Sequence, residues 1–238
     1  MKLFCLPYAG SSAVIYEKWK KRLAPSAVCI PMELAGRGTR TREPFYMGMA
    51  DAAADMLERL KAHMDGTPYA LFGHSMGGMI MYEVCHLIRA QGLQPPAMLF
   101  FSGRPAPEVP RREAPSHELP DDEFAQRILD IGATSAELFA NQQLRDIFMP
   151  ILRADFRLIE TYKYEDRGPL PWPITAIAGI DEVWTEAELE AWNGHTSAGC
   201  QIVRMEGGHF YLQDNAEPLL MLLQSRLAQD SSMETMFA

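Results

Sequence analysis

Residues 69–78 read YALFGHSMGG, and this stretch decides the fold. Tyr69–Phe72 is a short apolar run that predicts a buried strand. Gly73–Gly77 then matches the pattern G-x-S-x-G, and Met76–Ala90 has the apolar spacing of an amphipathic helix. A strand, a sharp turn and a helix in this order form the nucleophile elbow, in which the central serine sits on a strained turn. We therefore expect Ser75 to be a catalytic nucleophile.

The flanking sequence alternates between strand-like and helix-like segments, as a parallel sheet covered on both faces requires. Together with the elbow, this alternation predicts an α/β-hydrolase fold, with a mostly parallel sheet and helices on both faces. The other expected strands are Lys2–Leu6, Val28–Pro31, Ala97–Ser102, Ile174–Gly179 and Gln201–Met205. The other expected helices of the core are Ala13–Leu23, Met49–Met64, Glu186–Trp192 and Leu219–Leu227.

One segment interrupts the alternation. Residues 103–173 contain no strand pattern; they begin with a proline-rich stretch and continue with three helical patterns, Asp121–Ile131, Ser135–Phe139 and Leu144–Tyr164. We expect residues 1–103 and 174–230 to form the core, residues 104–173 to form a helical lid insertion, and residues 231–238 to be a flexible tail. A separate small domain in place of the lid is the alternative.

Composition excludes several classes of protein. The chain has 238 residues, of which 47% are hydrophobic and 22% charged, and its formal net charge is −9. An acidic chain is a poor general binder of nucleic acid, and no apolar run approaches the roughly 20 residues of a membrane span. The four cysteines are widely separated and predict reduced thiols, so we expect a cytoplasmic protein without a metal site.

A serine nucleophile needs a base and an acid that orients it. In this fold the chain order is serine, acid, histidine, and the histidine lies on the loop after the last strand. His209 occupies that loop, and Asp181 directly follows the strand Ile174–Gly179. We expect the triad Ser75, Asp181 and His209, with Glu182 as the alternative acid.

The oxyanion hole needs two backbone N–H groups. Met76 N–H follows the nucleophile directly, and the loop after the first strand supplies the second donor in this fold. We favour Ala9 in that loop and keep Gly10 as the alternative.

Four ordered motifs resemble the external (type II) thioesterases that accompany nonribosomal peptide and polyketide synthases. They are FCLPYAG at residues 4–10, ELAGRG at 33–38, GHSMGG at 73–78 and GGHF at 207–210. The resemblance implies hydrolysis of acyl thioesters on the phosphopantetheine arm of carrier domains, which removes misprimed or stalled units. It implies a monomer whose partners are carrier domains. It also implies no cofactor, since phosphopantetheine arrives with the substrate.

Three other interpretations fit the same residues. A carboxylesterase or lipase uses the same triad and differs only in its pocket. An acyltransferase passes the acyl group to an amine or alcohol, and a non-catalytic assembly-line partner only binds the carrier.

For carrier docking the best candidates are Arg37, Arg40 and Arg42, three positive charges near the end of a strand. The alternative interpretations are a solvated loop, or a structural role in which Arg37 holds the glycine-rich turn.

Overall fold

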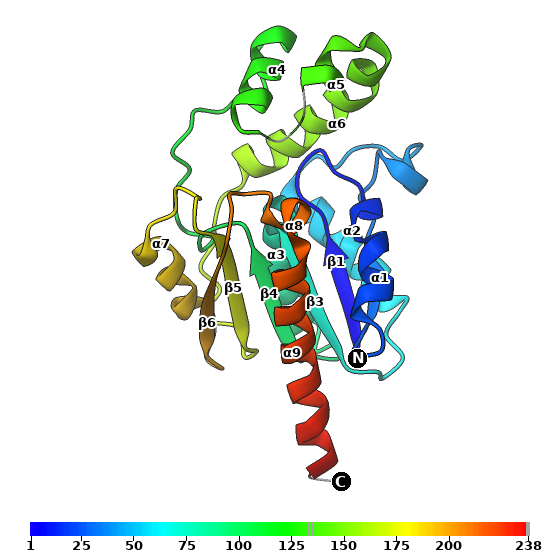
Figure 1. The fold of residues 1–238 in the computed structure, drawn as a ribbon, viewed down its shortest axis with the longest axis vertical. Helices are drawn as coiled ribbons and strands as arrows, with labels where there is room; N and C mark the ends of the chain where they lie inside the picture. Colours follow the sequence, from blue (N-terminus) through cyan, green and yellow to red (C-terminus); the bar gives the residue numbers. More distant parts are fainter. Residues whose placement is uncertain (133, 135, 237–238) are drawn as a thin grey trace.

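Six strands form one sheet in which every pairing is parallel (Figure 1). The computed structural model describes residues 1–132, 134 and 136–236, with side chains described to residue 228. The strand order is β2-β1-β3-β4-β5-β6, and the expected α/β fold with a parallel sheet is confirmed. The strands are β1 (Lys2–Leu6), β2 (Val28–Pro31), β3 (Tyr69–His74), β4 (Met98–Ser102), β5 (Ile174–Gly179) and β6 (Cys200–Met205).

Alternate residues of each strand point to opposite faces of the sheet, so each face has its own core. Phe4, Leu71 and Phe101 pack with α2 (Met49–Lys61) and α3 (Met76–Ala90). On the opposite face, Leu3, Phe72 and Phe100 pack with α1 (Glu17–Leu23) and α9 (Ala216–Met236), and α9 crosses the front of the sheet in Figure 1. These continuous apolar strands are typical of a sheet that is buried on both sides.

Helix α9 differs from the sequence prediction at both ends. It begins at Ala216 because Pro218 lies in its first turn, where proline is tolerated. The helix continues to Met236, within the segment 231–238, and the expected flexibility of this segment stays a prediction. Residues 237 and 238 lie outside the described part of the chain.

The segment between β4 and β5 lies over the edge of the sheet at which the strands end (Figure 1). Its helices are α4 (Asp121–Asp130), α5 (Ala136–Ala140) and α6 (Gln142–Thr161). Phe124 and Ile128 of α4 pack against Met149, Leu152 and Phe156 of α6, which gives the segment a small core of its own. The helices of this segment therefore cover the edge of the sheet at which the strands end. The division of the chain into a core and a lid that moves relative to it stays a prediction.

Candidate active site

Ser75 lies between the last residue of β3 and the first residue of α3, with a φ of 54°. This left-handed conformation is rare for a residue with a side chain and indicates local backbone strain. The flanking glycines are required because the chain turns so tightly. A Cβ atom at Gly73 would lie 2.4 Å from the carbonyl oxygen of Gly77, and one at Gly77 would lie 2.3 Å from that of Leu6. The strand, turn and helix therefore form the elbow that the sequence predicted.

Two backbone donors in the elbow and in the loop after β1 have no hydrogen-bond partner among the described residues. Met76 is the first residue of α3, so its N–H has no carbonyl partner within the helix. Ala9 lies in the loop after β1, in a turn closed by the hydrogen bond from Ser11 N to Tyr8 O at 3.1 Å. The N–H of Gly10 donates instead to the Asp155 carboxylate at 2.7 Å. Gly10 N–H is therefore already bonded, and the role of Ala9 as the second oxyanion donor stays a prediction.

His209 lies on the loop between β6 and α8 (Tyr211–Asp214). Its Nδ1 contacts Oε1 of Glu182 at 2.6 Å, and the Glu182 side chain is only 4% exposed. The other carboxylate oxygen of Glu182 accepts the N–H of Gly179 at 2.7 Å. An ionised carboxylate at Nδ1 fixes the tautomer in which Nε2 is free to accept a proton.

The partner of His209 corrects the sequence prediction. Asp181 is solvent-exposed, and only its backbone N–H contacts the histidine loop, by a 3.1 Å hydrogen bond to Gly207 O. The turn after β5 therefore directs the neighbouring Glu182, not Asp181, toward the imidazole. We assign the orienting role to Glu182 as a proposal.

A second histidine connects the elbow to the His209 loop. His74 is fully buried, with Nδ1 2.7 Å from the Ser102 hydroxyl and Nε2 2.9 Å from the backbone oxygen of His209. Because the carbonyl can only accept, Nε2 carries the proton and Nδ1 accepts from Ser102. Burial, and secondarily the nearby charge of His209, holds the pKa of His74 well below its usual value. The His74 ring is thus neutral, and it connects the turn that carries Ser75 to the loop that carries His209.

The pair formed by His74 and Ser102 is not itself an accessible nucleophile and base. Both side chains are completely buried, and the Ser102 hydroxyl also contacts the Tyr211 hydroxyl. Ser102 has ordinary strand backbone at the end of β4, whereas Ser75 has the strained turn and the helix terminus. The buried pair therefore supports the site from behind.

Two of the three arginines proposed for carrier docking are internal, which corrects that expectation. Arg37 is 4% exposed and forms a two-pronged ion pair with Asp155, with both N–O distances 2.5 Å. Arg40 is 6% exposed and contacts Glu43 and Asp55. Both charges are neutralised inside the protein, so neither is available to a partner.

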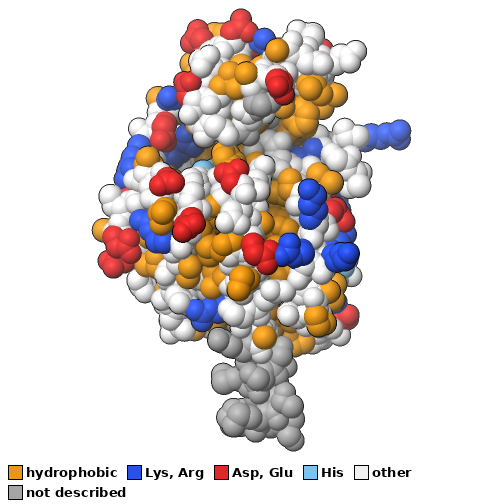
Figure 2. Space-filling view, in the orientation of Figure 1, with side chains coloured by type: hydrophobic (Ala, Val, Ile, Leu, Met, Phe, Trp, Pro, Cys, Tyr) orange, Lys and Arg blue, Asp and Glu red, His pale blue; other side chains and the backbone are white. Residues whose placement is uncertain are grey.

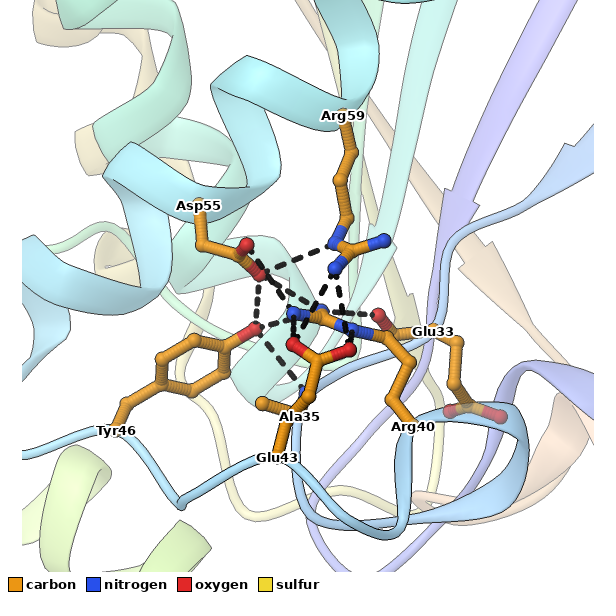
Figure 3. A network of polar contacts seen from close by, with 7 residues as sticks. All are labelled: Glu33, Ala35, Arg40, Glu43, Tyr46, Asp55 and Arg59. Atoms are coloured by element: carbon orange, nitrogen blue, oxygen red, sulfur yellow. Dashed lines mark hydrogen bonds and ion pairs between the residues drawn. The ribbon is translucent and has the colours of Figure 1, made fainter.

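Figure 3 shows the surroundings of Arg40, which lies at the centre of a polar network. Its guanidinium donates to the backbone oxygen of Glu33 at 2.9 Å and to the Tyr46 hydroxyl at 3.0 Å. Arg59 of α2 contacts the carboxylates of Glu43 and Asp55, which also bind Arg40. These bonds attach the loop after β2 to helix α2. Arg42 is exposed, and its role in docking stays a prediction.

A small pocket lies between the loop after β1 and the insertion. It is lined by Tyr8, Gly10, Ser11, Thr134, Leu138, Phe148 and Leu152.

In the part of the chain that the structure describes, no three histidine, cysteine or carboxylate side chains gather in a way that could hold a metal ion. No helix in this part is long and apolar enough to cross a bilayer.

The elbow, the histidine–carboxylate pair and the parallel sheet define a serine hydrolase of the α/β-hydrolase class. A model of the thioesterase domain family matches residues 1–227, and the chain belongs to this family, whose activity is hydrolysis of thioester bonds. The expected resemblance to type II thioesterases is confirmed by the relatives that follow.

Among similar proteins, LgrE of Brevibacillus parabrevis, named a linear gramicidin dehydrogenase, is 38% identical over 229 residues, which cover 94% of this chain and 87% of LgrE. The structure of ClbQ from the colibactin NRPS/PKS pathway has a TM-score of 0.92 at 34% identity and covers 98% of both chains. The type II thioesterase BorB from the borrelidin biosynthetic cluster has a TM-score of 0.85 at 32% identity, over 95% of this chain and 92% of BorB.

Proposed function

We propose that this thioesterase removes acyl groups from the phosphopantetheine arm of carrier domains in nonribosomal peptide or polyketide biosynthesis. The observation that carries the proposal is Ser75 on its strained turn together with the His209–Glu182 pair, whose loop is bonded to the elbow through His74. Similarity to ClbQ and BorB over almost the whole chain supports the assembly-line context. Editing is the corresponding role, since stalled acyl groups block a carrier until they are hydrolysed.

The reaction proceeds in two steps. Nε2 of His209 removes the Ser75 proton as Oγ attacks the thioester carbonyl, while Glu182 stabilises the imidazolium. The N–H groups of Met76 and Ala9 bind the oxyanion, and each such donor typically contributes about 3 kcal/mol. His209 then returns the proton to the departing pantetheine sulfur. In the second step, His209 activates water, which attacks the acyl-serine and releases the acid.

The net charge of this chain does not direct a carrier domain to any one of its faces. The chain is acidic, at −9, and the face in Figure 2 carries acidic and basic side chains side by side without one dominant sign. Attraction between the two proteins therefore has to be local. Arg42 is the exposed member of the arginine set and remains our candidate for this contact.

The test compares an acetyl-carrier protein with an oxygen ester of the same acyl group. We expect the wild-type chain to prefer the acetyl-carrier, and Ser75→Ala to lose at least about 1,000-fold in kcat with an unchanged melting temperature. Preference for the oxygen ester would indicate a carboxylesterase or lipase. Transfer to an added amine or alcohol in place of hydrolysis would indicate an acyltransferase, and carrier binding without turnover a non-catalytic partner.

A further inference from the structure

Helix α6 of the insertion lies directly against the loop that carries Ala9. The carboxylate of Asp155, on α6, accepts the N–H of Gly10 at 2.7 Å, and its side chain is 1% exposed. Leu152, one turn earlier, covers the same glycine so closely that a Cβ atom there would lie 2.4 Å from Leu152 Cδ2. Ala9 itself packs against the small core of the insertion. The loop is therefore shaped by the insertion as well as by β1.

Arg37 completes this contact from a third element. Its guanidinium holds both oxygens of Asp155 and also donates to the backbone oxygen of Ser11 at 3.1 Å. The side chain of Arg37 is 3% exposed. One buried ion pair thus joins the loop after β2, helix α6 and the loop after β1.

The ion pair restrains peptide groups that are next to the oxyanion donor. Gly10 N–H belongs to the rigid peptide plane that follows Ala9, and Asp155 fixes the direction of that plane. Between this plane and the N–H of Ala9 only the two dihedral angles of Ala9 remain. If the carboxylate is lost, the plane of Gly10 is no longer held, and the dihedral angles of Ala9 that set the direction of its N–H lose this restraint.

We propose that Asp155, held by Arg37, is a positioning residue that aims the N–H of Ala9 at the oxyanion. The inference rests on the proposed function only in taking Ala9 as an oxyanion donor. It assigns a catalytic purpose to a contact between insertion and core: the hole has its productive geometry only while α6 is docked on the loop.

The variant Asp155→Asn tests the proposal because an amide cannot replace the carboxylate in either orientation. If its oxygen accepts from Gly10, the amide NH2 faces the guanidinium of Arg37, and if it is flipped, the NH2 faces Gly10 N–H. Arg37→Lys is the milder variant, since it keeps the charge but loses the two-pronged contact. The matched control is Asp55→Asn, which breaks the ion pair of Arg40 at a distance from the loop after β1.

The measurements are kcat and KM for a short pantetheine thioester, the rate at which a fluorophosphonate labels Ser75, and the melting temperature. Misplacement of one oxyanion donor predicts a fall of about 10- to 100-fold in kcat and in labelling rate for Asp155→Asn, with KM within about twofold. Arg37→Lys should lose about 3- to 10-fold in both rates. Asp55→Asn should lower the melting temperature but keep both rates within about twofold of the wild type.

Equal losses of kcat in Asp155→Asn and Asp55→Asn would overturn the proposal, because they would reduce the role of Asp155 to general stability. A raised KM with unchanged kcat would also overturn it and would place Asp155 in substrate binding. If Asp155→Asn does not fold, the rates of Arg37→Lys decide the question. Labelling of Ser75 does not depend on the substrate, so a chain that labels but does not cleave thioesters contradicts the proposed function and leaves the positioning test valid.

Discussion

Asp181 and Glu182 are adjacent carboxylates with opposite surroundings. Asp181 is exposed, whereas the Glu182 side chain is 4% exposed and binds both His209 and the N–H of Gly179. We predict that Glu182→Gln lowers kcat by about 1,000- to 10,000-fold, because the wrong tautomer of His209 is then favoured. Steady-state kinetics on a pantetheine thioester measures the loss.

The neighbouring variant Asp181→Asn is the control for this prediction. We expect it to keep kcat within about threefold of the wild type, since exposed substitutions have small effects. A larger loss in Asp181→Asn than in Glu182→Gln would restore Asp181 as the acid.

Ser75 and His209 could be proposed from the sequence because each lies in a local pattern: the glycine-flanked elbow and the loop after the last strand. Sequence reasoning favoured the wrong neighbour for the contact with His209, since the direction of the turn after β5 decides between two adjacent carboxylates. It also favoured Arg37 and Arg40 for carrier docking, with Arg37 as a support of the glycine-rich turn among the alternatives. Their partners Asp155 and Asp55 are distant in sequence, and only the folded chain brings them together.

Among the elements, the strands were the most predictable. Lys2–Leu6, Val28–Pro31 and Ile174–Gly179 have the predicted bounds, because each is a continuous apolar run between turn residues. The helices of the insertion shifted by a few residues at their ends, as expected where caps and tertiary packing set the boundaries. Ser135, where we expected α5 to begin, lies outside the described residues.

The insertion contains helices of unequal stability. Helix α5 has no buried residue, whereas α6 buries Ile151, Leu152 and Phe156. We predict that amides of α5 exchange with solvent much faster than those of α6, and that β3 exchanges most slowly of the three. Hydrogen exchange followed by mass spectrometry on the intact chain measures this order. Equal protection of α5 and β3 would contradict a mobile lid and indicate a rigid cover.

For the molecule as a whole, two neutral buried histidines make stability depend on pH. Burial holds the pKa of His74 well below its usual value, and burial with the charges of Arg167 and Arg89 lowers the pKa of His86 to about 3. The unfolded chain takes up a proton at each histidine below about pH 6.5, and the folded chain does not. Their contribution to stability is therefore complete above that pH and is lost progressively as pH falls toward the lower pKa of the folded state, which for His86 is about 3.

The variant His86→Gln isolates one of these contributions. At pH 5.5 the linkage amounts to about 1.4 kcal/mol for His86, and at pH 7.5 it is close to zero. We predict that the free energy of unfolding falls by about 1.4 kcal/mol less in His86→Gln than in the wild type between these two pH values. Urea titrations at both pH values provide the comparison. Parallel decreases in the two proteins would show that His86 does not remain neutral in the folded state.

The place at which the insertion leaves and rejoins the sheet matters for experiments that exchange this insertion between related proteins. The insertion leaves at the end of β4 and comes back at β5, whose register is fixed by pairing such as Leu99 with Ile174. The entropy of closing such a loop grows only with the logarithm of its length, so a doubling costs about 0.6 kcal/mol. Loop closure alone therefore does not prevent a foreign insertion of different size from being grafted between these strands, provided that it replaces core side chains such as Leu158. A graft that lacks the carboxylate of Asp155 would leave the N–H of Gly10 without this partner, and we expect it to hydrolyse thioesters about 10- to 100-fold more slowly.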